Sequence, residues 1–152
     1  MKIIRALFFS TLFLSFSAPF AWAAENDTIY VIVNQKLQIT ELDKKQVMSL
    51  FLGRARNFPN GDIAKPFDHK IGSSIRESFF KNLTGKEISD IDAYWARLSY
   101  SGRAFPPKSF GNVNDILEEV SRNKNAISYV KGKSSEELLQ KGINIVYSIK
   151  AQ

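Results

Sequence analysis

The residues best suited to chemistry lie in one stretch, residues 68–77, which reads DHKIGSSIRE. A Gly-Ser-Ser turn there leads from a predicted strand into a predicted helix. The first backbone N–H groups of a helix have no partner within it and carry positive potential. The hydroxyls of Ser73 and Ser74 add hydrogen-bond donors, and Lys70 and Arg76 add positive charge. Together these groups are able to hold a tetrahedral oxyanion such as phosphate or sulfate.

A purely structural interpretation of the same stretch stays open. Serine is among the commonest residues at the N-cap of a helix, so Ser73 or Ser74 would precede a helix without any ligand. Arg76 would then be an ordinary solvated charge on the surface. From the residues alone, capping is the simpler explanation of the serines, because it requires no bound anion.

Other kinds of site find little support in the composition. The chain has no cysteine, which excludes disulfides and thiolate metal sites, and its single histidine, His69, excludes a His-rich zinc site. The acidic residues are dispersed, without the paired spacing typical of glycosidases or metal sites: Glu41, Asp43, Asp62 and Asp68. No nucleophile, base and oxyanion hole come together. We therefore predict no catalytic residue, no metal and no cofactor, and no enzyme activity.

The N-terminus has the order of a secretory signal. Lys2 and Arg5 form a basic start, an apolar run follows over residues 3–20, and Ala-Trp-Ala stands at residues 21–23. This is the basic, apolar, A-x-A pattern of a cleavable signal peptide. The uninterrupted apolar core is shorter than the roughly 20 residues that a membrane-spanning helix requires. We predict cleavage after Ala23.

Removal of residues 1–23 would leave one domain over residues 24–152, with a net charge lowered from +6 to +4 by the loss of two basic residues. A domain of this size holds a single core without staples. No second long apolar run follows, so we expect no stable membrane insertion after cleavage and a periplasmic location. The basic residues are scattered, and this together with export indicates no nucleic-acid partner.

Predicted strands and helices alternate along the chain. β-branched and apolar runs predict strands at residues 28–33, 63–67, 126–130 and 143–149. Apolar faces and caps predict helices at residues 43–52 (capped by Thr40), from Ser73 or Ser74 through Leu83, at 89–100, from Asn112 or Asn114 to Arg122, and at 135–140. This alternation favours an α/β domain, in which helices flank a mixed sheet.

An ordered set of motifs resembles landmarks of the phosphate-binding proteins of ABC transporters. The motifs are Leu50-Phe51-Leu52-Gly53, Phe58-Pro59-Asn60-Gly61, Gly72-Ser73-Ser74-Ile75-Arg76-Glu77-Ser78-Phe79, Tyr94-Trp95-Ala96-Arg97, Gly102 with Pro106-Pro107, and Ala126-Ile127-Ser128-Tyr129-Val130. The order and spacing of these motifs agree with those of the family over nearly all of residues 24–152. The resemblance implies the type 2 periplasmic-binding fold, and the length suffices for about one of its two lobes.

The resemblance also implies where an anion would bind. The family's loop reads Gly-Ser-Gly-Thr-Arg-Glu, and it implies phosphate or a related oxyanion bound by Ser73, Ser74 and Arg76, with Lys70 and His69 assisting. This chain has Ser74 where the family has glycine and Ile75 where it has threonine. The second change removes a hydroxyl ligand and places a β-branched apolar group at the site.

Two functions of different classes follow. The first is a periplasmic solute-binding module for phosphate or a related oxyanion. The second is a single-lobe adaptor that has lost ligand binding and serves an envelope or signalling complex, in contact with an envelope protein or a second copy of itself. The absent second lobe and Ile75 motivate the second function. A small periplasmic hydrolase is a distant third, because no triad is evident.

Overall fold

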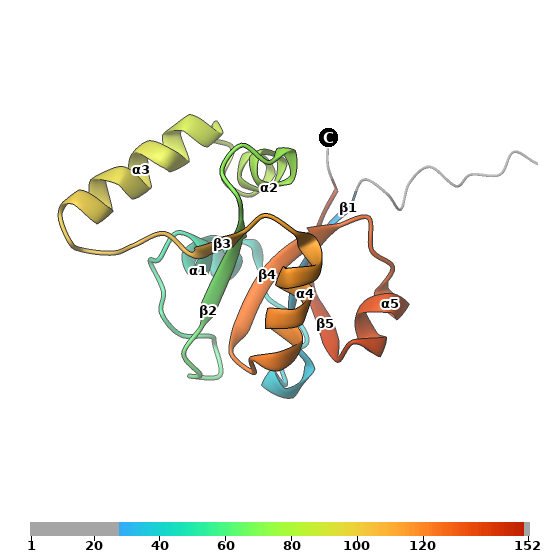
Figure 1. The fold of residues 1–152 in the computed structure, drawn as a ribbon. Coiled ribbons are helices and arrows are strands. Elements are labelled where there is room, and N and C mark those ends of the chain that lie inside the picture. The colour runs from blue at the N-terminus through green and yellow to red at the C-terminus, as the bar shows by residue number, and fades with distance from the viewer. Residues whose placement is uncertain (1–27, 151–152) are drawn as a thin grey trace, which may run out of the picture.

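A five-stranded mixed sheet forms the centre of the molecule (Figure 1), in a computed structural model that describes residues 28–150. The strands are β1 (Thr28–Asn34), β2 (Lys65–His69), β3 (Lys108–Phe110), β4 (Ala126–Lys131) and β5 (Ile143–Lys150). Their order across the sheet is β3-β2-β4-β1-β5. β2 runs parallel to both β3 and β4, whereas β1 is antiparallel to β4 and β5. The carboxyl ends of β2, β3 and β4 therefore share one edge of the sheet.

Helices cover both faces of this sheet (Figure 1). They are α1 (Lys44–Phe51), α2 (Ser74–Thr84), α3 (Ile88–Tyr100), α4 (Val113–Arg122) and α5 (Ser135–Gln140), with a short 3₁₀ helix η1 (Gln35–Leu37). Side chains of β1 alternate between two cores, as successive residues of a strand must. Val31 packs with α1, α2 and α3 on one face, and Ile32 packs with α4 and α5 on the other.

The predicted fold class is confirmed. The apolar run at residues 28–33 forms β1, whose last four residues are all buried, as expected for a strand with a helical layer on each side. The glycine-serine turn leads from β2 into α2, also as predicted. None of the helices among residues 28–150 is both long and apolar enough to cross a membrane.

Two local predictions were wrong, and one strand was not predicted. Asp43, not Thr40, caps α1, because Asp43 and Gln46 each accept a hydrogen bond from the other's backbone N–H at 2.8 Å, which satisfies two N–H groups at once. The second strand covers residues 65–69 rather than 63–67. β3 was missed, because a three-residue strand with two exposed side chains has no readable pattern. The predicted signal peptide lies outside the described residues.

The topology decides where a ligand would find access. α2 begins just after β2, and α4 begins just after β3, at the shared carboxyl edge. The backbone N–H of Lys70 donates to the carbonyl of Phe110 at 2.9 Å, which holds the two turns together. In open α/β sheets, ligands bind outside the carboxyl ends of the strands. This edge is therefore where functional side chains are expected.

Candidate functional site

The end of β2 places two polar side chains inside the molecule. Asp68 and His69 are its last two residues, and both are buried. After them the chain turns through Gly72, whose φ of +85° lies in the left-handed region that glycine adopts without strain. α2 then begins at Ser74, so the stretch predicted to hold an anion is a strand–turn–helix unit at the carboxyl edge.

Arg76 is not the solvated surface charge of the structural interpretation. Its side chain is only 4% exposed and pairs with two carboxylates: Nε lies 2.9 Å from Asp68 Oδ2, and Nη2 lies 2.7 Å from Asp92 Oδ1. The third nitrogen, Nη1, is buried with no hydrogen-bond partner among the described residues. Burial alone would lower the pKa of Arg76, but hydrogen bonds to Asp92 and Asp68 outweigh it and raise the pKa. The guanidinium therefore stays charged.

Asp68 is the centre of this buried cluster. One of its oxygens accepts from the hydroxyl of Tyr129 and from the backbone N–H of His69, at 2.7 Å for the latter, while the other accepts from Arg76. The ring of Tyr129 stacks on Phe79 with centroids 3.6 Å apart. Burial, followed by the negative charge of Asp68, raises the pKa of Tyr129 well above its ordinary value. Tyr129 thus remains a neutral donor to an ionised carboxylate.

His69 has a defined tautomer in this setting. Its Nε2 lies 2.8 Å from the backbone carbonyl of Tyr129. A carbonyl only accepts, so Nε2 carries the hydrogen and Nδ1 of the neutral ring is an acceptor. Burial lowers the pKa of His69, although the carbonyl of Tyr129 and the charge of Asp68 act in the opposite direction. The ring is neutral at pH 7, so it would assist an anion only if the anion itself carries a proton.

The two serines and Lys70 occupy the turn and the first turn of α2. Ser73 is the N-cap residue, but its side chain makes no capping hydrogen bond, and its Oγ is buried without a partner among residues 28–150. Ser74 and Lys70 are exposed, and the aliphatic part of Lys70 lies over Gly111 in the neighbouring turn. Ser73 and Arg76 are three residues apart at the start of α2, but of the predicted anion-binding residues only His69 and Arg76 line the neighbouring cavity.

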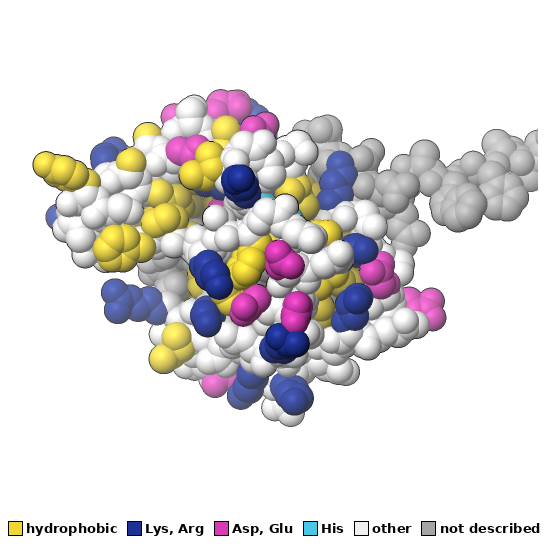
Figure 2. Space-filling model, in the orientation of Figure 1, with side chains coloured by type: hydrophobic (Ala, Val, Ile, Leu, Met, Phe, Trp, Pro, Cys, Tyr) yellow, Lys and Arg dark blue, Asp and Glu magenta, His cyan; other side chains and the backbone are white. Residues whose placement is uncertain are grey.

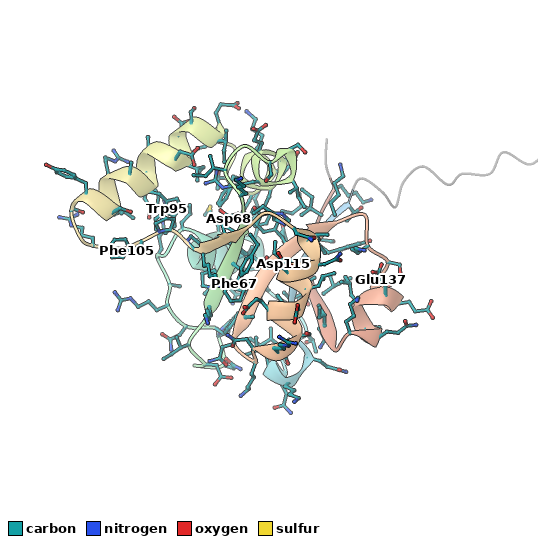
Figure 3. The ribbon with its side chains drawn as sticks, in the orientation of Figure 1. Phe67, Asp68, Trp95, Phe105, Asp115 and Glu137 are labelled. Atoms are coloured by element: carbon teal, nitrogen blue, oxygen red, sulfur yellow. The ribbon has the colours of Figure 1, made fainter. Side chains whose placement is uncertain are left out.

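A cavity of about 250 Å³ adjoins this cluster. Asp68, His69 and Arg76 line it from β2 and α2, and Asp92 and Trp95 line it from α3; Figure 3 shows Asp68 and Trp95 on β2 and α3. Pro106, Pro107 and Ser109 also belong to the lining. The indole Nε1 of Trp95 is a further buried donor without a partner in the described part of the chain. Two carboxylates against one guanidinium make the lining net negative, which disfavours a dianion.

Sequence reasoning missed four members of the cluster, beginning with Asp68, which was taken for one of several dispersed acids. Asp92 lies 16 residues from Arg76 on a different helix, and Tyr129 lies 61 residues from Asp68, so no local pattern connects them. Trp95 was interpreted only as a core aromatic, which its 5% exposure bears out without revealing its unpartnered nitrogen. No group of three or more metal-ligating side chains occurs among residues 28–150.

Three solved structures share this architecture. A putative phosphate ABC transporter substrate-binding protein from Clostridium perfringens, solved with bound phosphate, matches with a TM-score of 0.58 and 15% identity over 80% of this chain and 46% of its own. An ABC-type phosphate transport receptor from Vibrio cholerae matches with a TM-score of 0.59 and 15% identity over 79% of this chain and 45% of its own. PstS from Borrelia burgdorferi matches with a TM-score of 0.62 and 15% identity over 79% of this chain and 46% of its own.

The fold resembles that of somewhat less than half of each of these phosphate-binding proteins. The resemblance predicted from the motifs is therefore confirmed at the level of the fold. This chain spans a little under half the length of each of these structures, as expected for a single lobe. No family model matches the chain, and no curated protein sequence matches it. At 15% identity the likeness carries the architecture and not the site.

Proposed function

We propose that this chain is a periplasmic, single-lobe binding protein for a protonated oxyanion, with phosphate as the first candidate. The fold supports a binding role, and the similar protein from Clostridium perfringens holds phosphate. The predicted signal peptide over residues 1–23 supports export, followed by action of residues 24–152 as one domain. Ser73 and Arg76 are the central contacts of this proposal, with Ser74, Lys70 and His69 around them.

The observation that carries the proposal is a charged, buried guanidinium with an unused donor. Nη1 of Arg76 and Oγ of Ser73 are both buried without a partner, three residues apart at the start of α2. An unsatisfied buried polar group costs about 1–3 kcal/mol, and more when it is charged. A ligand oxygen that accepts from Nη1 would remove that cost, and the N-terminus of α2 adds favourable potential for an anion.

The carboxylates set the protonation state of the ligand. Asp68 already accepts from three donors, whereas Asp92 is 40% exposed and lines the cavity with acceptor capacity to spare. An oxyanion that bears a hydroxyl donates it to Asp92 while its other oxygens accept from Arg76. Sulfate has no such proton near pH 7 and would face Asp92 with unrelieved repulsion. Phosphate is therefore expected to bind more tightly than sulfate.

A single lobe leaves one side of this ligand in water. Solvent weakens each charged hydrogen bond, so affinity is expected to be modest unless a second copy or an envelope protein covers the site. The three similar structures are each more than twice as long as the matched region. Modest affinity in the isolated chain is thus part of the proposal.

Calorimetric titration of the purified protein tests the proposal. Phosphate is expected to bind in the millimolar range or better, at least tenfold more tightly than sulfate, and more tightly at pH 6 than at pH 8. Ser73→Ala should weaken phosphate binding several-fold. Ser78→Ala, one turn further along α2, is the matched control. The absence of heat at 10 mM phosphate, or equal affinity for sulfate, would overturn the proposal.

A second function is favoured by a separate observation. Tyr100 and Phe105, at the end of α3 and in the loop after it, are 97% and 73% exposed. Aromatic side chains are enriched in protein–protein interfaces relative to the rest of the surface. This supports the adaptor role in an envelope or signalling complex. That the chain is not an enzyme remains a prediction, in keeping with neighbours that are transport binding proteins.

A further inference from the structure

A groove of about 680 Å³ lies on the other side of α3 from Arg76. Met48 and Leu52 at the end of α1 form one wall, and Asp90, Tyr94 and Arg97 of α3 form the other. Asp92 and Trp95, which line the cavity of the proposed anion site, face the opposite side of the same helix. The two cavities share no lining residue, so the groove is separate from the proposed anion site.

The floor of the groove is apolar and held in place. Leu52 and Ile91 are buried beneath it, and the half-buried Met48 packs against the same core. The hydroxyl of Tyr94 donates to the backbone carbonyl of Leu52 at 2.8 Å, which ties α3 to the end of α1. Trp95 lies 3.0 Å from the position that a Cβ on Gly53 would take, so the junction behind the groove is tightly packed. The groove is therefore formed before any partner arrives.

The rim of the groove is basic. Arg54, Lys86 and Arg97 line it and are all exposed, and Asp90 is the one acidic side chain in its lining. No ion pair engages any of these three cations among residues 28–150, in contrast to Arg76. Asp90 and Arg97 are seven residues apart, so the charged rim extends about 10 Å along the helix. Three cations around an apolar floor are complementary to an occupant that is apolar on one side and acidic at its edges.

The surface continues beyond the groove along α3. Tyr100 follows Arg97 by three residues, so the two lie on the same side of the helix, and Phe105 follows in the loop. Figure 2 shows hydrophobic side chains gathered at the end of the molecule that is built from α3 and this loop. Tyrosine and arginine are the side chains most enriched at the energetic centres of protein interfaces. Because Tyr100 lies outside the groove, a ligand that contacts both must be longer than a small solute that fills the groove alone.

We propose that the groove between α1 and α3 binds an acidic, amphipathic peptide segment of a partner protein. Apolar side chains of about two helical turns would lie on Met48 and Tyr94, and carboxylates on either side would pair with Arg54, Lys86 and Arg97. Burial of an apolar helix face in a preformed groove is an established mode of peptide recognition. This surface does not depend on anion binding at Arg76, since it lies on the other face of α3.

A displayed library of random 12-residue peptides, panned on the purified protein, tests this directly. The expected result is enrichment of sequences that combine glutamate or aspartate with apolar residues at helical spacing. Peptides synthesised from that pool should bind at least tenfold more weakly to the Arg54→Glu/Arg97→Glu double variant. Their affinity should also fall as salt is raised from 50 to 300 mM, because exposed charges are screened. Phosphate titration of the double variant should match the wild type, which separates this proposal from the previous one.

Two further variants, one of them a control, test whether the peptide lies in the groove and reaches Tyr100. Lys36→Glu reverses an exposed charge in η1, away from the groove, and should leave peptide affinity unchanged. Tyr100→Ala should weaken peptide binding at least threefold, although Tyr100 does not line the cavity. Enrichment of neutral or basic sequences, an equal loss with Lys36→Glu, or no enrichment at all would overturn the proposal. So would a simple apolar carboxylate such as decanoate that displaces the peptides with equal affinity, or self-association that the double variant abolishes.

Discussion

The arginines on the two sides of α3 have opposite environments, buried and paired on one side and exposed on the other. On the inner face Asp92 approaches the guanidinium of Arg76, which is 4% exposed and also holds Asp68 at 2.9 Å. On the outer face Arg97, with Arg54 across the groove, is exposed and has no ion pair within the described residues. On one side of α3, carboxylates of the protein itself neutralise the arginine. On the other side, the arginines are free to pair with a partner molecule.

The difference follows from solvation. A guanidinium removed from water must be paired, because the loss of solvation costs several kcal/mol per ion. Exposed arginines keep their water and contribute little to stability, since surface pairs are worth about 0–1 kcal/mol. The inner face is therefore expected to determine whether the chain folds. The outer face is expected to matter only when a partner is present.

The largest effect is expected from Asp68→Asn, which breaks the centre of the inner cluster. Arg76 would lose a buried counter-charge, and unfolding free energy should fall by about 3–5 kcal/mol. Urea unfolding followed by circular dichroism measures this. Asp90→Asn, on the outer face of α3, is the matched control and should change stability by less than about 0.5 kcal/mol. Equal effects of the two variants would contradict the comparison.

Tyr129→Phe should have the next largest effect. It removes one hydrogen bond to the ionised Asp68 and leaves the stacking on Phe79 in place. Hydrogen bonds to charged groups contribute about 1.5–3 kcal/mol, so we expect a loss in that range. The same urea series measures it, with Tyr147→Phe, on β5, as the control. A loss below 0.5 kcal/mol would mean, by the same scale, that the hydroxyl is not a donor to Asp68.

A pH dependence should follow from His69. Burial lowers its pKa in the folded protein below the ordinary value of 6.5, so the unfolded chain binds a proton first as pH falls. The contribution of His69 to the free energy of unfolding is therefore fully present above pH 6.5. It decreases below that pH, by up to about 1.4 kcal/mol per pH unit, until the pKa of the folded state is reached. Thermal unfolding between pH 7.5 and 5 measures this, and His69→Gln should flatten that part of the curve. An unchanged curve would show that another group titrates.

The smallest effect is expected on the outer face. Arg54→Glu/Arg97→Glu should shift unfolding free energy by no more than about 0.5 kcal/mol, because neither side chain has a described partner. Urea midpoints at low and high salt measure this. A loss above about 1 kcal/mol would show that these arginines support the fold and would remove the contrast between the two faces.

Much of the fold could be predicted from local patterns. β1 and β4 are apolar runs, and the structure buries nearly all of both. The turn at Gly72 and the start of α2 followed from residue types alone. The errors were also local. Asp43 and Gln46 have the spacing of a capping box, a signal that was overlooked in favour of Thr40. β3 is too short to have a period.

The candidate site was predictable only in part. Its position after a strand, with Ser73 at a helix start and Arg76 one turn on, was evident from the sequence. That Arg76 is buried was not, because Asp92 reaches it from another helix and Asp68 from the preceding strand. The groove on the outer face was not predicted at all, because Arg54 and Arg97 become neighbours only when α1 and α3 pack.

The sequence by itself determined four of the five strands, the order of the five α-helices, the turn at the carboxyl edge of β2 and the resemblance in fold, because backbone preferences and apolar periodicity act over a few residues. Only the tertiary structure decided which charges are neutralised and which remain available. Whether an arginine keeps its water depends on the residues that the fold brings around it. For Arg76 those residues are Asp68 and Asp92, whose carboxylates pair with the guanidinium. For Arg97 they are the residues of the groove, among which it has no ion pair within residues 28–150.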